Sequence, residues 1–204
     1  MIITENVICE GSLAVQGGIS GTNRAGMTAS ASSVYPVELQ LFRVWDAFQT
    51  SLGTAAADDL GITAGVFGVG APYIVSRDLN ALGASTGYAR ALFTLPVEYE
   101  ATGSVALRIY AGMLTTVASV SATVDAEIWR SDKDGTIGGA DLVTTSATAC
   151  NSTTVAAKDF AMSYSGLAPG DQLDVRIAMI LSSATGSSHF CIIPSVEFIL
   201  TVKG

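Results

Sequence analysis

The residues of this sequence best suited to chemistry are carboxylates that occur in small groups. Asp132, Asp134 and Asp141 fall within one glycine-rich stretch of ten residues. Carboxylate oxygens at such spacing could bind calcium, but an EF-hand loop needs glycine at its sixth position and glutamate at its twelfth. Here glycine comes at the fourth position and no such glutamate follows. The stretch Asp132–Asp141 is therefore interpreted as a structural turn, with a weak oxygen-ligand cation site as the alternative.

Two further carboxylate pairs match the needs of an acid–base reaction only in part. Asp58 and Asp59 are adjacent, and Glu98 and Glu100 lie two residues apart. A hydrolase requires two acids with different pKa values on either side of a cleft. The aspartates precede a Leu-Gly pair typical of a loop, and the glutamates share one face of an extended segment. Both pairs are interpreted as solvated surface groups, and a hydrolase stays a third hypothesis for function.

The single histidine and the three cysteines give no recognisable catalytic or metal-binding pattern. His189 stands beside Cys191 in an apolar segment, where it is interpreted as the start of a strand. Cys9, Cys150 and Cys191 are odd in number, widely spaced and without a CxxC pair, which favours buried free thiols over a disulfide framework or a zinc site. No G-x-S-x-G motif marks a serine nucleophile. We therefore assign no catalytic, cofactor-binding or metal-binding residue, and no cofactor.

The glycines and tryptophans also have ordinary structural explanations. The stretch 65–70 fits neither the dinucleotide-binding nor the P-loop pattern, and no lysine accompanies it. Trp129 is expected to share a strand face with Asp125 and Glu127, exposed or at an interface. Together with Trp45 it could form a platform for stacking sugars, although packing is the commoner role of a lone aromatic residue on a sheet.

The composition excludes several classes of protein. Of 204 residues, 49% are apolar and 14% are charged, against about 25% charged in a typical soluble domain. Mean hydropathy is +0.46 and the formal net charge is −8. These values exclude intrinsic disorder, and ten scattered basic residues argue against nucleic-acid binding. We expect no membrane association and no signal peptide, because no apolar run is long enough and the first residues lack a basic region.

Alternation of apolar and polar residues predicts an all-β protein. It is clearest over 119–130, where every second residue is apolar, and it recurs near the C-terminus. A short helix is expected between 46 and 65. The other predicted strands are 37–45, 67–79, 88–99, 104–114, 141–150, 158–165, 171–181 and 190–202. Such strands joined by Gly, Asp, Ser and Pro turns predict an antiparallel β-sandwich or jelly roll.

The N-terminal segment differs from the rest of the chain. Residues 1–36 carry few charges and many Gly, Ser, Ala and Thr residues without a regular period. This composition predicts an extended N-terminal arm followed by a jelly-roll β-sandwich domain at 37–204. The runs 177–181 and 190–193 are apolar on both strand faces, which predicts coverage by neighbouring subunits.

The region from Tyr88 to Gly170 and just beyond resembles the jelly-roll decoration, or cement, proteins of tailed bacteriophages. The resemblance rests on the order of several segments: LPVEY at 95–99, VALRI at 105–109, DAEIWRSD at 125–132 and SGLAPGDQLDVR at 165–176. It implies a structural virion protein without enzymatic activity or small-molecule substrate. It further implies a homotrimer, made in the host cytoplasm, that sits on the capsid surface and stabilises contacts between major capsid protein subunits. The alternative is a carbohydrate- or receptor-binding β-sandwich domain of a phage fibre or surface structure.

Overall fold

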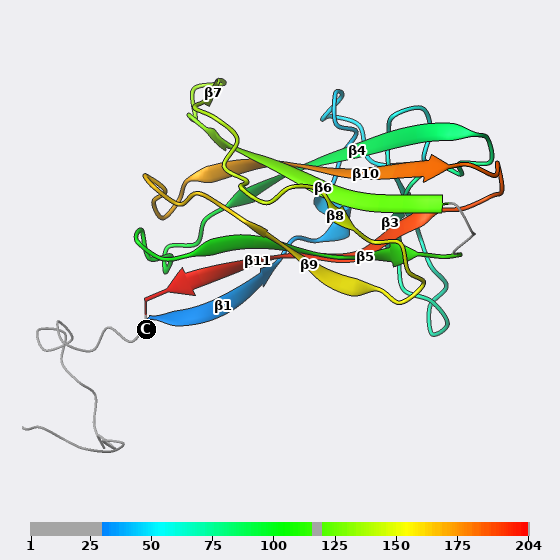
Figure 1. Cartoon of the computed structure of the whole chain (residues 1–204). Coiled ribbons are helices and arrows are strands. Elements are labelled where there is room, and N and C mark those ends of the chain that lie inside the picture. The colour runs from blue at the N-terminus through cyan, green and yellow to red at the C-terminus, as the bar shows by residue number, and fades with distance from the viewer. Residues whose placement is uncertain (1–29, 116–119, 204) are drawn as a thin grey trace, which may run out of the picture.

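Two antiparallel β-sheets pack face to face in the computed structural model, which describes residues 30–115 and 120–203 (Figure 1). The first, named the β11 sheet, has the order β2 (Gly61–Thr63), β3 (Tyr73–Val75), β11 (Cys191–Val202), β5 (Val105–Met113) and β9 (Ala156–Ala161), with β1 (Ala31–Pro36) also paired to β11. The second, named the β10 sheet, has the order β4 (Gly83–Thr94), β10 (Gln172–Ser183), β6 (Val120–Ser131) and β7 (Ile137–Gly138), with β8 (Thr148–Ala149) paired to β6. The predicted β-sandwich is confirmed.

Period-two alternation decides which way each long strand faces. In β6, the alternate residues from Val120 to Ile128 are buried, whereas the residues between them are partly or fully exposed. The neighbouring strands β10 and β6 pair in full register, with Asp174 opposite Trp129 and Arg176 opposite Glu127. Because side chains alternate between the two faces of a strand, these four residues share the outer face of the β10 sheet.

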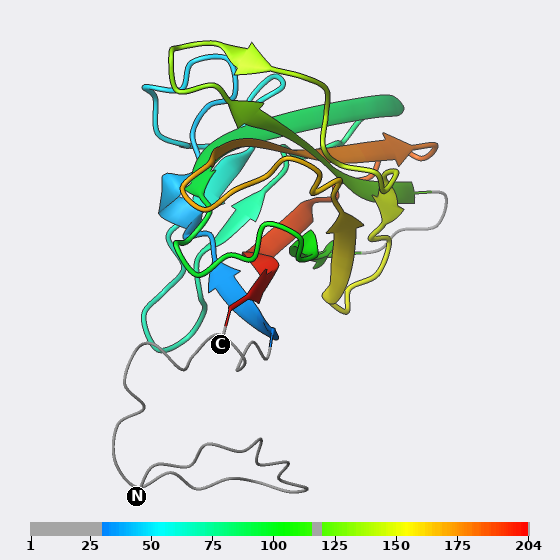
Figure 2. The same cartoon turned by 90° about the vertical axis from the view of Figure 1, so that its left-hand side faces the viewer.

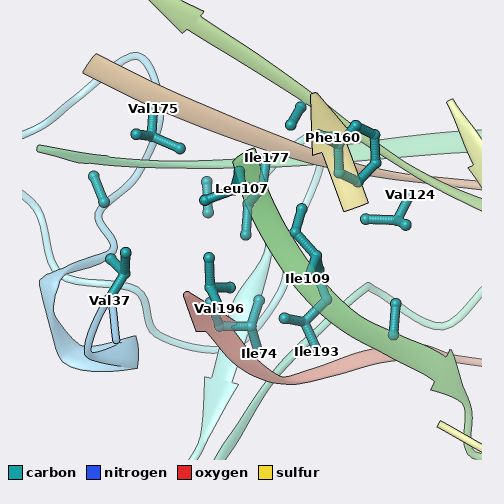
Figure 3. Close-up of a cluster of buried hydrophobic side chains, with 14 of the residues drawn as sticks. Val37, Ile74, Leu107, Ile109, Val124, Phe160, Val175, Ile177, Ile193 and Val196 are labelled. Atoms are coloured by element: carbon teal, nitrogen blue, oxygen red, sulfur yellow. The ribbon is translucent and has the colours of Figure 1, made fainter. Parts of the chain in front are cut away.

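The inner faces of the two sheets form one hydrophobic core. Figure 3 shows Leu107 and Ile109 of β5 pointing toward Val175 and Ile177 of β10, and all four are fully buried. At another point Phe93 of the β10 sheet stacks on Phe198 of the β11 sheet, with ring centroids 4.2 Å apart. Such interdigitating aliphatic and aromatic side chains supply most of the stability of a sandwich of this size.

The segment 43–60 closes the free edge of β4. Backbone hydrogen bonds join Arg43 and Arg90 in both directions, at 2.8 and 3.0 Å, and the N–H of Leu60 donates to the carbonyl of Tyr88 at 2.9 Å. In Figure 1 this blue to cyan segment lies beside and above β4, and β7 rises from the other side of the same sheet. Segment 43–60 and β7 therefore border the outer face of the β10 sheet on its two sides.

Four predicted elements differ in the structure, and one of them is the strand expected at 67–79, of which only β3 forms. The helix expected between 46 and 65 is absent from that described segment, because backbone bonds to β4 and a left-handed Ala57, with φ of 49°, hold it in turns. The strand expected at 37–45 contains a 3-10 turn, η2 (Leu39–Leu41). The strand expected at 141–150 is reduced to β8. In each case tertiary pairing overrides local preference.

The sandwich begins earlier than the sequence indicates. Residues Ala31–Pro36, placed in the arm by composition, form β1 and pair with β11 in an unbroken antiparallel register from Ala31 opposite Val202 to Pro36 opposite Glu197. The rest of the expected arm, 1–29, lies outside the described residues. Within the described ranges, no helix has the length and apolar character needed to cross a membrane.

Candidate functional site

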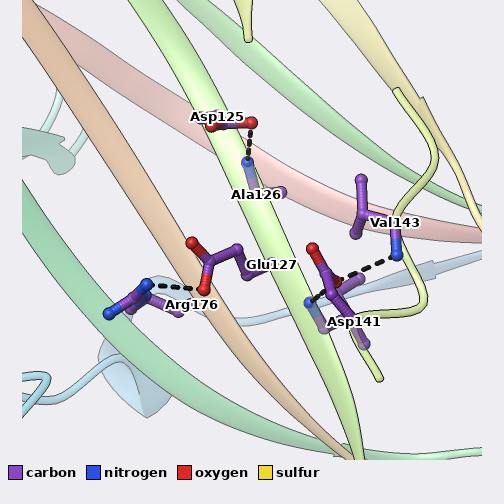
Figure 4. Close-up of polar contacts among 7 residues, drawn as sticks. Asp125, Ala126, Glu127, Asp141, Val143 and Arg176 are labelled. Carbon is purple, nitrogen blue, oxygen red and sulfur yellow. Dashed lines mark hydrogen bonds and ion pairs between the residues drawn. The ribbon is translucent and has the colours of Figure 1, made fainter. Parts of the chain in front are cut away.

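The three aspartates of the glycine-rich stretch are held by local hydrogen bonds. The N–H of Asp132 donates to the Thr136 carbonyl at 3.1 Å, and Oδ1 of Asp134 accepts from the hydroxyl and N–H of Thr136 at 2.7 and 2.9 Å, which lowers the pKa of Asp134. Asp141 accepts instead from the N–H of Ile128 at 2.9 Å (Figure 4). Among the residues that the structure describes, no group of three or more His, Cys, Asp or Glu side chains could hold a metal ion.

The adjacent pair Asp58 and Asp59 lies at the edge of the outer face of the β10 sheet. Asp58 accepts a hydrogen bond from Nε1 of Trp45 at 3.2 Å. Oδ1 of Asp59 is buried and has no hydrogen-bond partner among the described residues. Burial of this carboxyl group, with the nearby charges of Asp58 and Asp46, raises the pKa of Asp59. Of the two aspartates, Asp58 is the one that orients the Trp45 indole, through the hydrogen bond from Nε1.

The other candidate residues have structural partners. Glu98 and Glu100 follow β4, and Glu100 accepts a hydrogen bond from the Ser30 hydroxyl. His189 is completely buried just before β11, with Nδ1 2.6 Å from the Ser187 carbonyl oxygen. Its Nε2 has no hydrogen-bond partner among the described residues.

Two of the three cysteines fall in the described part of the chain. Cys150 and Cys191 are buried free thiols, as the sequence predicts. Cys9 lies outside the described residues. Cys150 directly follows β8 of the β10 sheet, and Cys191 begins β11 of the other sheet.

A cavity of about 440 Å³ lies on the outer face of the β10 sheet, and we name it the Trp129 site. Its base consists of side chains from three neighbouring strands, and its sides come from the segment 43–60 and from β7. The residues that line it are Trp45, Asp46, Arg90, Glu127, Trp129, Ile137, Asp174 and Arg176.

Two guanidinium–carboxylate pairs form the base of the Trp129 site. Asp174 is buried and accepts both a 2.7 Å bond from Nε and a second bond from a terminal nitrogen of Arg90. Arg176 donates to Oε2 of Glu127 at 2.5 Å, as Figure 4 shows. Bidentate geometry fixes the plane of the Arg90 guanidinium group, and the hydrogen bond to Asp174 raises the pKa of Arg90 further.

Aromatic rings of β4 and of segment 43–60 contact the two arginines. The guanidinium carbon of Arg176 lies 4.9 Å from the ring centroid of Tyr88 and 5.5 Å from that of Trp45. The guanidinium carbon of Arg90 lies 5.2 Å from the ring centroid of Phe48. Such cation–π contacts keep long side chains in one rotamer and preorganise the base of the site.

Trp129 differs from the other rings of this site. It is only partly buried, and it takes part in none of the aromatic or cation–π contacts found among the described residues. Its position in the middle of the β10 sheet, opposite Asp174 on β10, fixes its backbone rigidly. Ile137 of β7 lines the same cavity and is 47% exposed. The site therefore offers an apolar platform next to fixed polar groups.

The sequence indicated only part of this site. Trp45, Trp129 and the outward position of Glu127 were expected; Trp129 does share the outer face with Glu127 and is partly exposed there. Arg90, Asp174 and Arg176 were missed. In the sequence of β10, Asp174 and Arg176 alternate with apolar residues, and this pattern could have indicated that both lie on the outer face of the sheet.

Comparisons with known proteins assign neither a family nor a function to this chain. No family model and no curated protein matches the sequence. Similar solved structures include the CBM22-1 xylan-binding domain of Paenibacillus barcinonensis Xyn10C, at 15% identity and a TM-score of 0.40, covering 86% of this chain and 99% of that one. TmCBM61 in complex with beta-1,4-galactotriose matches at 7% identity and a TM-score of 0.39, covering 83% and 88%. Infectious bursal disease virus Gx strain matches at 12% identity and a TM-score of 0.32, covering 95% and 54%. These values assign no ligand or partner to this chain.

Proposed function

We propose that this β-sandwich is a carbohydrate-binding module that holds a neutral glycan in the Trp129 site. The observation that carries the proposal is the partly exposed Trp129 ring on a rigid strand, beside two fixed guanidinium–carboxylate pairs. An indole face packs against the C–H face of a sugar ring, because both surfaces are flat and apolar. Carboxylates accept, and guanidinium groups donate, the hydrogen bonds that sugar hydroxyls need.

The charge of the site favours a neutral ligand. Two guanidinium groups and three carboxylates line the cavity, so its formal charge is not positive. Both arginines are already paired with carboxylates at hydrogen-bond distance. A phosphate, a sulfate or an acidic sugar would meet these carboxylates at close range and be repelled. Hydroxyl groups, by contrast, can bond to either member of each pair.

The size and rigidity of the site suit recognition without catalysis. A volume of about 440 Å³ lies within the usual range for small-ligand sites, and preorganised side chains reduce the entropy lost on binding. Binding of this kind requires no chemical step, so the proposed function is non-catalytic.

Affinity electrophoresis with soluble polysaccharides tests the proposal. The full chain is run through gels that contain xylan, galactan, glucomannan or a mixed-linkage β-glucan, with polygalacturonate as the acidic comparison. We expect retardation by at least one neutral polysaccharide, little dependence on NaCl concentration, and no retardation by polygalacturonate. Trp129→Ala should weaken the retarding interaction by about 30-fold, because truncating a central aromatic anchor costs about 2 kcal/mol.

Phe67→Ala is the matched control, because Phe67 is fully exposed and belongs to the β2–β3 hairpin of the other sheet. It should bind as the unmodified chain does. Absence of retardation in all four neutral gels, or equal binding by the Trp129→Ala variant, would rule out a glycan in the Trp129 site.

A second candidate function is capsid decoration, and the apolar tip of the β2–β3 hairpin favours it. Val66, Phe67 and Val69 are 63%, 106% and 87% exposed. In Figures 1 and 2 this hairpin projects away from both sheets. Exposed apolar groups of this kind mark protein contacts. In this proposal the chain is a homotrimer on the virion capsid surface, and the hairpin tip contacts the major capsid protein or a sister subunit.

Light scattering of the full chain tests the assembly part of this candidate. A trimer should have three times the 20.9 kDa mass of one chain. Phe67→Ser should shift the protein toward lower mass, because it removes the most exposed apolar ring, whereas Trp129→Ala should not. A monomer at every concentration up to the solubility limit would argue against the trimer.

A further inference from the structure

Two cysteine side chains meet inside the sandwich, one just after β8 of the β10 sheet and one at the start of β11. The sulfur atoms of Cys150 and Cys191 lie 3.3 Å apart, although the residues are 41 positions apart in sequence. Cys150 is 3% exposed and Cys191 is 0% exposed. A disulfide bond has an S–S length of about 2.05 Å, so bond formation requires the two sulfurs to approach by roughly 1.2 Å in total. Small rotations of both side chains can provide that movement.

Backbone hydrogen bonds anchor each cysteine to its own sheet. The N–H of Cys150 donates to the carbonyl of Ala122 in β6 at 2.9 Å. The N–H of Cys191 donates to the Ser76 hydroxyl at 3.0 Å, and its carbonyl accepts from the Ser76 N–H at 3.0 Å. The contact between the thiols therefore joins two fixed points, one on each sheet, and does not depend on a loose loop.

We propose that Cys150 and Cys191 are a disulfide-forming pair, and that oxidation by a small disulfide compound covalently links the β10 sheet to the β11 sheet. In the first step one protein thiolate attacks the oxidant, an S–S bond forms to the protein, and one thiolate leaves. In the second step the other cysteine loses its proton to solvent and attacks the protein-bound sulfur, and the second thiolate leaves. Two protein thiols and one disulfide compound thus give one protein disulfide and two small thiols.

The surroundings favour Cys150 as the first nucleophile. The contact with Cys191, together with the nearby positive charge of Lys158, lowers the pKa of Cys150. Cys191 has the opposite shift, because the contact with Cys150 and burial both raise its pKa. Cys150 is also the more exposed of the two. The reaction therefore begins at Cys150 and is completed by Cys191.

The experiment uses the full chain with Cys9→Ser, so that only this pair can react. The folded protein is treated with hydroxyethyl disulfide at pH 8 and then analysed by intact mass, by alkylation of free thiols in denaturant and by peptide mapping without reduction. We expect a mass loss of about 2 Da, a fall from two free thiols to none, and a linked Cys150–Cys191 peptide pair. Closing this loop should raise Tm by about 5–15 °C, and dithiothreitol should reverse the rise.

Two controls make the result decisive. Cys150→Ala in the same background should show neither the mass loss nor the rise in Tm. The same Cys9→Ser chain oxidised in guanidinium chloride establishes that the oxidant can form the bond. If that unfolded sample is oxidised while the folded protein keeps two free thiols, or forms only mixed adducts or linked dimers, the proposed pair is wrong.

Discussion

At the scale of single residues, burial decides what each ion pair contributes. Asp174 is 6% exposed and pairs with Arg90, whereas the side chain of Asp159 is 50% exposed and pairs with Arg108 at 2.6 Å. Both carboxylates receive two hydrogen bonds from their arginine. Water competes with the exposed pair, but removal of Asp174 leaves a guanidinium group without its buried partner.

Asp174→Asn and Asp159→Asn therefore form a matched pair of variants. We expect Asp174→Asn to lower the free energy of unfolding by about 1–3 kcal/mol and Asp159→Asn to lower it by less than about 1 kcal/mol. Urea unfolding at pH 7, followed by tryptophan fluorescence, measures both. If the two substitutions lower the free energy of unfolding equally, burial of Asp174 does not strengthen its ion pair.

The exposed pair of Arg108 and Asp159 also makes the stability of the protein depend on pH. The hydrogen bonds that Asp159 accepts from Arg108 lower the pKa of Asp159 below its ordinary value of 3.8. Stability from a carboxyl group with a lowered pKa is present above the ordinary value and is lost as pH falls through the folded value. The small difference between the unmodified chain and Asp159→Asn should therefore shrink progressively in urea titrations as pH is lowered below 3.8.

At the scale of elements, the β2–β3 hairpin depends on one glycine. Gly65 has φ of +65°, and a Cβ atom there would lie 2.3 Å from the Gly70 carbonyl oxygen. That oxygen accepts the N–H of Val66 at 2.9 Å, so the clash falls on the bond that closes the turn. Gly68 also has a positive φ of +77°, but open space surrounds it.

Gly65→Ala should consequently lower Tm more than Gly68→Ala, which introduces backbone strain alone. We expect the free energy of unfolding to fall by about 2–3 kcal/mol for Gly65→Ala and by about 1 kcal/mol for Gly68→Ala. Thermal unfolding followed by circular dichroism measures both. Neither should change glycan binding, because the hairpin belongs to the other sheet. If Gly68→Ala lowers Tm more than Gly65→Ala does, the clash at Gly65 does not destabilise the protein.

The sequence predicted those elements whose period is visible locally. The long strands β6, β10 and β11 were found because apolar residues recur at every second position along their sequences. β1 was missed because its first residues, Ala31, Ser32 and Ser33, are small and its partner lies at the other end of the chain. The Trp129 site depends on the pairing of β10 with β4 and β6, which no local pattern specifies.

At the scale of the whole molecule, some outward apolar residues of the strands are covered within one chain. The run 177–181 was expected to need neighbouring subunits for coverage, yet Ala178, on the outer side of β10, is only 8% exposed and lies between Tyr88 and Asp125. In the other sheet, Ile192 is 9% exposed, and Val155 packs over the adjacent Gly112. Exposed apolar groups are instead prominent at the β2–β3 hairpin.

The position of β11 has a consequence for the order in which the protein forms during synthesis. This strand pairs with β1, β3 and β5, yet it follows all of them in the sequence. The three long strands of the β10 sheet are complete once Ser183 has left the ribosome, whereas β1 has no partner in its sheet until the last twelve strand residues follow. All the long strands of the β10 sheet are therefore synthesised before the β11 sheet can be completed, and apolar surface left uncovered in this interval is open to aggregation and to chaperones.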